Sequence, residues 1–266
     1  MAQTASTVQS SARPFGLDIT APVNFAASDD ASIDFQQNAL PSITDLLNTK
    51  LGEKVSFNNQ TAYSLDPTKL RLATESTARV YFIGEGAGYQ NTLGFNALPA
   101  GTPTPKTVLT ADSSLIFPNS SSPVSAYDLA SSAIRRSSEP LLPGDFVDLG
   151  TFEAGTTLDF FVIANGARGG TNAYAAPAAR NPDQLDHVVA FVLPDSPYLI
   201  IGFEDLFNGG DRDYNDVVFA VDIGAANLQR LISTPEPSTW ATMAGCLGWV
   251  VLSVRRRRSI ATLDTP

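Results

Sequence analysis

The spacing of apolar residues along the chain changes near residue 54. Before that point, residues 36–51 carry apolar side chains three and four positions apart, at Leu40, Ile43, Leu46, Leu47 and Leu51. This period places the side chains on one face of an α-helix. Ser42 and Asp45 resemble a capping box in which Asp replaces Glu. We therefore predict one short helix within residues 36–53 that packs on its own domain, with a partner-binding helix as the alternative.

Residues 54–223 have a different sequence pattern, with short runs of β-branched and aromatic residues separated by Gly, Pro, Asn and Asp. Such runs are typical of β-strands, and nearly continuous apolar runs indicate strands that are buried on both faces. The predicted strands are residues 53–57, 79–83, 115–117, 146–152, 158–164, 187–193, 198–203 and 217–222. With neither a fixed-period repeat nor strand–helix alternation, we predict an all-β, two-sheet antiparallel β-sandwich of jelly-roll-like type.

The opening segment of the chain is expected to carry little structure, and a linker is expected after the β region. Residues 1–35 are rich in Ala, Ser, Thr and Asp and sustain no apolar run, so we expect a flexible lead-in there and a linker at residues 224–234. The lead-in also shows no basic and apolar export leader. Because the end of the chain indicates export, we attribute this to a start codon placed too far downstream or to a trimmed sequence.

Charge and residue counts exclude several kinds of chemistry. The formal net charge is −10, which is expected to repel nucleic acid and to attract cations. The single cysteine, Cys246, allows no intramolecular disulfide, and the single histidine, His187, allows no multi-histidine zinc site. We read His187 as a structural histidine, and we expect the protein not to be an enzyme.

The densest group of polar residues lies in residues 204–216, between two predicted strands. Five carboxylates within thirteen residues repel one another unless a cation or hydrogen bonds offset them. Calcium takes six to eight oxygen ligands with tolerant geometry, and Gly209 and Gly210 would let the chain wrap tightly around an ion. We therefore predict calcium as a cofactor. The candidate ligands are Glu204, Asp205, Asp211, Asp213, Asn215 and Asp216, with Glu85 as a distant addition.

Other interpretations of the same loop differ in what they require. An EF-hand would need Gly where Asp216 stands, and it would need helices where the flanks predict strands. A solvated turn, whose Asp and Asn side chains bond their own backbone, is the plainest alternative to calcium. A glycosidase pair of carboxylates is a third possibility, although such pairs normally come from separate strands.

A second segment sets Glu85 among Gly84, Gly86 and Gly88, just after a predicted strand. The sequence lacks the remaining residues of a phosphate-binding loop, so a nucleotide site is not expected. The segment is either a glycine-rich hairpin turn or a source of one further ligand, from Glu85 or Asn91, for the acidic residues above.

Four stretches together resemble the DUF4114 domain, a β-rich module of bacterial surface and adhesin-like proteins. They are residues 85–91, 115–119, 158–166 and 202–221, and the domain would cover residues 54–223. The resemblance implies an extracellular, calcium-stabilised binding or structural module, and it names no ligand.

The C-terminal residues 235–258 resemble the PEP-CTERM sorting signal, which an exosortase of the inner membrane processes. The residues that carry the resemblance are Pro235, Glu236, Pro237, Trp240, Arg255, Arg256, Arg257 and Arg258. Between them, residues 241–254 predict an apolar helix of about 21 Å, shorter than a hydrocarbon core of about 30 Å. The arginines and residues 259–266 would stay cytoplasmic. A core helix beside a basic nucleic-acid patch is the alternative.

These observations lead to one main expectation about function. We expect an exported, non-catalytic protein of the cell surface or exopolysaccharide matrix, anchored transiently in the inner membrane as a transmembrane helix before sorting. The alternatives are a calcium-dependent glycan-binding adhesin and a secreted polysaccharide hydrolase.

Overall fold

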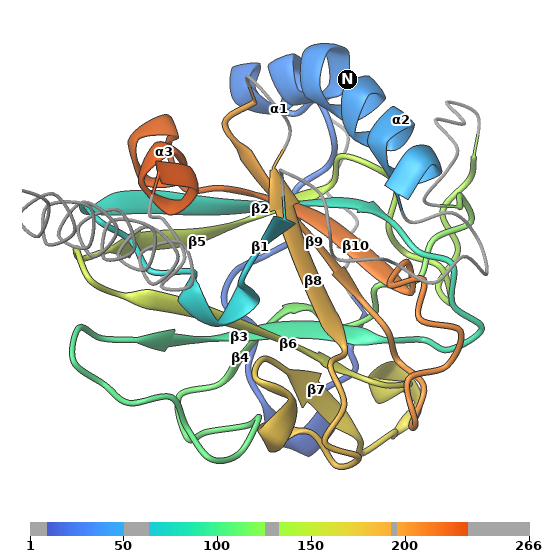
Figure 1. Cartoon of the computed structure of the whole chain (residues 1–266). Coiled ribbons are helices and arrows are strands. Elements are labelled where there is room, and N and C mark those ends of the chain that lie inside the picture. The colour runs from blue at the N-terminus through green and yellow to red at the C-terminus, as the bar shows by residue number, and fades with distance from the viewer. Residues whose placement is uncertain (1–9, 51–63, 126–132, 193–195, 234–266) are drawn as a thin grey trace, which may run out of the picture. The chain divides into compact units, whose positions relative to one another are not determined.

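The computed structural model describes residues 10–50, 64–125, 133–192 and 196–233, and within them ten strands form two antiparallel sheets (Figure 1). The six-stranded sheet has the order β1 (Ser64–Leu65), β8 (Val188–Val192), β9 (Tyr198–Phe203), β10 (Val217–Asp222), β2 (Ser76–Gly84) and β5 (Phe146–Phe152). The four-stranded sheet has the order β4 (Ser114–Phe117), β3 (Thr92–Leu98), β6 (Thr157–Ile163) and β7 (Ala173–Ala175). The prediction of two antiparallel sheets is confirmed.

One hydrophobic core lies between the sheets and contains residues of both. Phe160 of β6 packs against Phe219 of β10, with ring centroids 5.2 Å apart. Phe82 of β2 meets Phe117 of β4 edge to face at 5.9 Å. The apolar run of β6 is buried on both of its faces, because alternate residues enter the shared core and a smaller cluster on the opposite face of the same sheet. This matches the continuous apolar pattern of that strand.

The predicted helix starts earlier than expected. Helical turns run from Asp30 through α1 (Asp30–Asp34), the π-helical η2 (Phe35–Ala39) and α2 (Leu40–Lys50). Asp29 caps this helix, since its side chain accepts from the amide of Ser32 at 2.7 Å and the Ser32 hydroxyl accepts from the amide of Asp29 at 3.0 Å. The capping box at Ser42 and Asp45 was therefore wrong.

The apolar face of this helix does pack on its own domain, as predicted. Phe35, Ile43 and Leu47 are fully buried in a second cluster on the outer face of the six-stranded sheet. There the ring of Phe35 stacks on Tyr81 of β2 at a centroid distance of 3.9 Å. The helix thus covers the sheet face that the four-stranded sheet leaves open.

Two segments expected to lack structure are ordered by backbone hydrogen bonds. In the described part of the lead-in, which includes η1 (Pro14–Gly16), the amide of Thr20 donates to Leu115 of β4, and Asn24 exchanges two bonds with Phe146 of β5. The predicted linker forms α3 (Ala225–Ser233), which buries Leu228 in the shared core. In the described residues 10–35 and 224–233, these polar segments thus complete sheet edges and cap the core, which their composition does not reveal.

Strands β5, β9 and β10 match their predicted bounds, and β2, β4, β6 and β8 match to within a few residues. The short strands β1 and β7 were not predicted, and neither was β3. The predicted strand at residues 53–57 lies outside the described residues, as does the predicted apolar helix at 241–254. Among the helices that are described, none has the length and apolarity that a membrane crossing requires.

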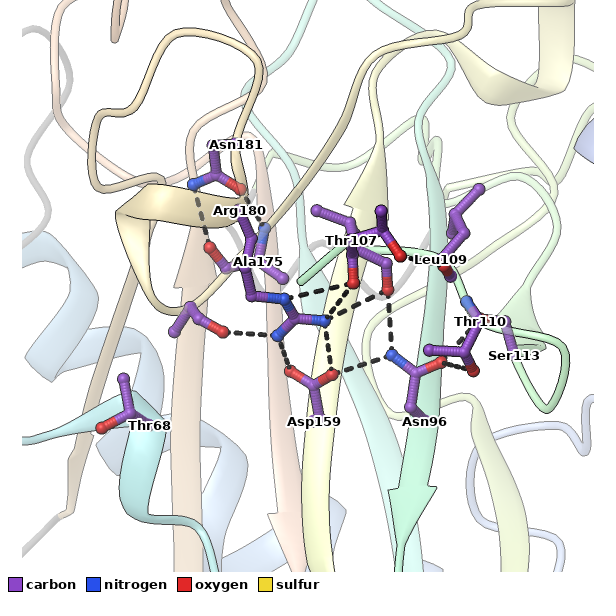
Figure 2. Close-up of polar contacts among 12 residues, drawn as sticks. Thr68, Asn96, Thr107, Leu109, Thr110, Ser113, Asp159, Ala175, Arg180 and Asn181 are labelled. Carbon is purple, nitrogen blue, oxygen red and sulfur yellow. Dashed lines mark hydrogen bonds and ion pairs between the residues drawn. The ribbon is translucent and has the colours of Figure 1, made fainter. Parts of the chain in front are cut away.

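A buried ion pair fixes the β3–β4 connection to the outer face of the four-stranded sheet (Figure 2). Arg180, at the end of η5 (Ala178–Arg180), donates to both oxygens of Asp159 on β6 at 2.7 and 2.8 Å. The same guanidinium donates to the carbonyls of Thr107 and Ala176, and Asn96 of β3 donates to Asp159 at 2.8 Å. We call this group the Arg180 cluster, and each of its charges has a partner within the fold.

Candidate metal centre

The candidate site is the loop of residues 204–216, the acidic loop, which joins the paired strands β9 and β10 (Figure 1). Phe203 at the end of β9 lies opposite Val217 at the start of β10, and the amide of Asp216 donates to the carbonyl of Phe203 at 3.0 Å. Strand pairing therefore brings Glu204 and Asp216, the two ends of the loop, side by side. The strand flanks also agree with the exclusion of an EF-hand.

The loop turns sharply enough to fold its carboxylates inward. Asn208, Arg212 and Tyr214 have positive φ angles of 72°, 60° and 56°, a region that non-glycine residues seldom adopt. At Gly210, a Cβ atom would overlap the carboxylate of Glu204. Gly210 therefore lets the backbone pass close to the Glu204 side chain.

Five carboxylates converge in two groups that share Glu204. One group holds Glu204, Asp205 and Asp216, and the other holds Glu204, Asp211 and Asp213. In each group, one carboxylate oxygen per residue lies within 4.8 Å of the others. Three of the five side chains, those of Glu204, Asp205 and Asp213, are buried, whereas Asp211 is exposed. The structure thus brings together the five acidic residues that the sequence singled out in this loop.

Backbone amides of the loop donate to these carboxylates and hold them in place. The two oxygens of Glu204 accept from the amides of Leu206 at 3.2 Å and Arg212 at 3.1 Å. Asp216 accepts from the amide of Asp205 at 2.8 Å, and Asp213 accepts from that of Asn215 at 3.4 Å. Side chains therefore bond their own loop backbone, as in the solvated-turn alternative, but they are drawn together and largely buried.

The electrostatics of this group are unfavourable for ionised carboxylates. Burial, followed by the charges of Asp205 and Glu204, raises the pKa of Asp216 to about 9. Burial also raises the pKa values of Glu204 and Asp205, to which neighbouring carboxylates add. Within the described residues, no arginine or lysine forms an ion pair with any of these three side chains. A bound cation would favour the ionised form of all three.

The loop between β2 and β3, residues 85–91, is hydrogen-bonded to the acidic loop. Asn91 donates from its side chain to Asp205 at 2.6 Å and accepts from the amide of Asn165 at 2.9 Å. The amide of Gly86 donates to the carbonyl of Asn215 at 3.0 Å, and a Cβ atom at Gly86 would overlap the Asn215 side chain. Asn91 thus reaches the acidic group, as one alternative foresaw, but it does so as a hydrogen-bond donor to a carboxylate.

Glu85, the predicted distant ligand, is placed differently. Its carboxylate accepts from the amides of Ala87 at 2.9 Å and Ser122 at 3.2 Å. Burial raises its pKa to about 7, which these two amides partly offset. Glu85 belongs to neither group of converging carboxylates, so the structure does not bring it into the candidate centre.

His187 contacts the acidic loop and a neighbouring carboxylate through its two ring nitrogens. Its Nδ1 lies 2.9 Å from the carbonyl oxygen of Glu204, and its Nε2 lies 2.9 Å from the carboxylate of Asp183. The buried ring stacks on Tyr174 at 3.8 Å. Asp183 also accepts from the amide of Asn208 at 2.7 Å. The structural reading of His187 agrees with these contacts, whereas nothing in the sequence pointed to Asp183.

A cavity of about 340 Å³ opens beside the carboxylates. The acidic loop contributes its carboxylates, Asn215 and Leu206 to the lining, and the β2–β3 loop contributes Gly86, Gly88 and Tyr89. Tyr89 is 42% exposed and Leu206 is 43% exposed. Sequence reasoning missed both residues as part of the site, because only the fold brings the two loops to one cavity.

Residues 152–224 match the family described as "Domain of unknown function (DUF4114)". The match includes the whole acidic loop, and it is shorter than the range 54–223 that the resemblance implied, so Glu85 and Asn91 fall outside it. No curated protein and no solved structure matches the chain. The eight sorting-signal residues, from Pro235 to Arg258, lie outside the described part of the chain.

Proposed function

We propose that this chain is an exported, non-catalytic surface or matrix protein whose acidic loop binds calcium and is stabilised by it. The observation that carries the calcium proposal is the pair of carboxylate groups that share Glu204 and are largely buried. Within the described residues, Glu204, Asp205 and Asp216 form no ion pair with an arginine or a lysine. Calcium prefers carboxylate and carbonyl oxygens and tolerates irregular geometry. The proposed ligands are Glu204, Asp205, Asp211, Asp213, Asn215 and Asp216, without Glu85.

Calcium would act here as a structural ion. By keeping Asp205 ionised, the ion would preserve the charge-assisted hydrogen bond from Asn91. By holding Asn215, it would also fix the residue to which the amide of Gly86 donates. A hydrolytic role is less well supported. The carboxylate oxygens in each group lie within 4.8 Å, whereas glycosidase carboxyl groups stand about 5 to 9.5 Å apart with room for water or sugar between them.

The proposed location rests on the sequence of the tail. The motif at Pro235–Glu236–Pro237, the apolar residues 241–254 and the arginines 255–258 support sorting by an exosortase after transient anchoring in the inner membrane. A bacterial surface or exopolysaccharide matrix is the corresponding destination. The net charge of −10 fits a module that works with calcium outside the cell. For the fold, we further propose a β-sandwich of jelly-roll-like type.

A calcium titration of the full chain, followed by thermal unfolding, tests the metal. At calcium concentrations about 100-fold above Kd, the stabilisation should be about 2.7 kcal/mol, a rise in Tm of about 5 to 10 °C. EDTA should reverse it, and Asp213→Asn should abolish it. Asp112→Asn, an exposed carboxylate before β4, serves as the matched control and should keep the full shift. An unchanged Tm at millimolar calcium would refute the proposal.

A further inference from the structure

The cavity beside the acidic loop is much larger than one ion requires. Its volume of about 340 Å³ compares with about 30 Å³ for a water molecule in the liquid. An ion held by the carboxylates would therefore leave space for several further non-hydrogen atoms. Pockets that bind small organic molecules begin at about 300 Å³.

The walls of this cavity differ in character. One wall carries the carboxylates, and the opposing loop contributes Tyr89 together with the backbone at Gly86 and Gly88. Leu206 adds a second apolar side chain, and both it and Tyr89 are substantially exposed. An aromatic ring beside a dense group of oxygen ligands suits a molecule with one apolar face and one polar edge.

We propose that this cavity binds a neutral sugar whose neighbouring hydroxyl groups complete the coordination of the calcium ion, while its apolar ring face packs on Tyr89. The proposal rests on the calcium site proposed above and names the ligand class of that site. Calcium takes six to eight oxygens, and hydroxyl oxygens can replace the waters that would otherwise fill the open positions.

Charge selects a neutral ligand. The five carboxylates of the loop outweigh the two positive charges of one calcium ion, so an anionic sugar would meet net repulsion. A cationic ligand would compete with calcium for the same oxygens. A neutral molecule with vicinal hydroxyls avoids both penalties.

The position of Tyr89 depends on the hydrogen bonds that join the β2–β3 loop to the acidic loop. Tyr89 lies between Gly86, which bonds Asn215, and Asn91, which bonds Asp205. Both anchors join the β2–β3 loop to residues among the proposed calcium ligands. Calcium should therefore hold the aromatic wall as well as coordinate the sugar, and sugar binding should require the ion.

The experiment measures binding of the full chain to sensor surfaces that carry glucose, galactose, mannose, fucose or N-acetylglucosamine, in calcium and in EDTA. A surface carrying glucuronic acid is the anionic comparison. We expect retention on at least one neutral surface in calcium only. Tyr89→Ala should weaken that binding about tenfold, whereas Tyr89→Phe, which keeps the ring, should bind within about twofold of the wild type.

Calcium affinity is measured on the same samples by calorimetry, so that the two proposals fail separately. A chain that binds calcium but is retained on none of the five neutral surfaces overturns the sugar site alone. Retention that persists in EDTA, or that is unchanged in Tyr89→Ala, overturns it as well. A chain that binds no calcium overturns both proposals.

Discussion

The Arg180 cluster and the acidic loop are two regions where the same domain buries carboxylates, and they treat the charge in opposite ways. Asp159 is buried with both oxygens bonded to the guanidinium of Arg180. In the acidic loop, Glu204 and Asp205 are buried equally well beside other carboxylates, and amides and Asn91 are the donors described for them. The fold supplies its own cation in the first region, and we propose that the second region takes one from solution.

The ion pair of Asp145 and Arg135 strengthens this contrast. Asp145 is fully buried between β2 and the start of β5, and its carboxylate forms an ion pair with Arg135. It also accepts from the amides of Ala26 and Leu142. Asp145 and Asp159, the two carboxylates outside the acidic loop that are buried in the described residues, are thus each matched by an arginine, whereas the partly buried Glu85 accepts from two backbone amides. The predictions below test whether the two kinds of region respond to calcium, pH and mutation as differently as their charges require.

The largest effect is expected from Arg180→Met, which leaves Asp159 buried without its cation. Breaking one partner of a buried pair typically lowers the free energy of unfolding by about 3 to 5 kcal/mol. Urea denaturation of the full chain measures this loss, which should be the same with calcium and with EDTA. Adding Asp159→Asn to Arg180→Met should recover part of the stability. A loss that calcium reverses would show that the two regions are not independent.

The next effect concerns pH and arises from the acidic loop and Glu85 together. Burial raises the pKa of Glu85 to about 7 and that of Asp216 to about 9. Without calcium, the folded state therefore binds more protons than the unfolded state between about pH 4 and pH 9, so stability should fall as the pH rises. Thermal unfolding in EDTA across this range measures the slope.

Calcium provides the comparison for the pH series. A bound ion favours ionised ligands, so saturating calcium should make the fall in Tm shallower and leave mainly the contribution of Glu85. Identical slopes in EDTA and in calcium would contradict the assignment of the ion to these carboxylates.

A single substitution at Asp216 should separate the cost of burying this carboxyl group from its part in calcium binding. Asp216→Asn replaces a carboxyl group whose ionisation is opposed by burial, and it keeps an oxygen that can accept from the amide of Asp205. We expect the calcium-free protein to gain about 1 to 2 kcal/mol of stability and to lose most of its calcium response. Chemical denaturation in EDTA and in calcium measures both changes. A variant less stable than the wild type in EDTA would mean that burying this carboxyl group beside Glu204 and Asp205 does not cost stability.

The smallest effect is expected from Gly86→Ala, which disturbs the contact between the two loops. A Cβ atom there would overlap the Asn215 side chain, so calcium binding should weaken about tenfold, or about 1.4 kcal/mol. Gly88→Ala is the matched control, since a Cβ atom at that position meets no atom within 4 Å. Calorimetry should show weaker calcium binding for Gly86→Ala than for Gly88→Ala. Equal calcium affinities of the two variants would argue against a role for the contact between the loops in calcium binding.

The fold was predictable where strands are continuously apolar or β-branched, as in β9 and β10. It was not predictable at β3, where Gly94 and Asn96 interrupt the pattern. In the structure, Gly94 gives room for Phe161 of the neighbouring strand, and Asn96 bonds Asp159 in the Arg180 cluster. Both residues are explained by partners distant in sequence, which a local pattern cannot contain.

The candidate site likewise has a part that the sequence predicts and a part that it does not. The carboxylates are close in sequence, and the loop that holds them returns between paired strands, so their convergence could be predicted. Tyr89 and Asn91 join them because β10 pairs with β2 as well as with β9. That pairing brings the β2–β3 loop to the acidic loop, and only the sheet order reveals it.

Isothermal titration of the full chain with calcium at neutral pH tests the central claim most directly. The account predicts saturable binding in the wild type and in Asp112→Asn, and its loss in Asp213→Asn with the protein still folded. Absence of binding in the wild type, or equal binding in Asp213→Asn, would contradict the assignment of calcium to the acidic loop.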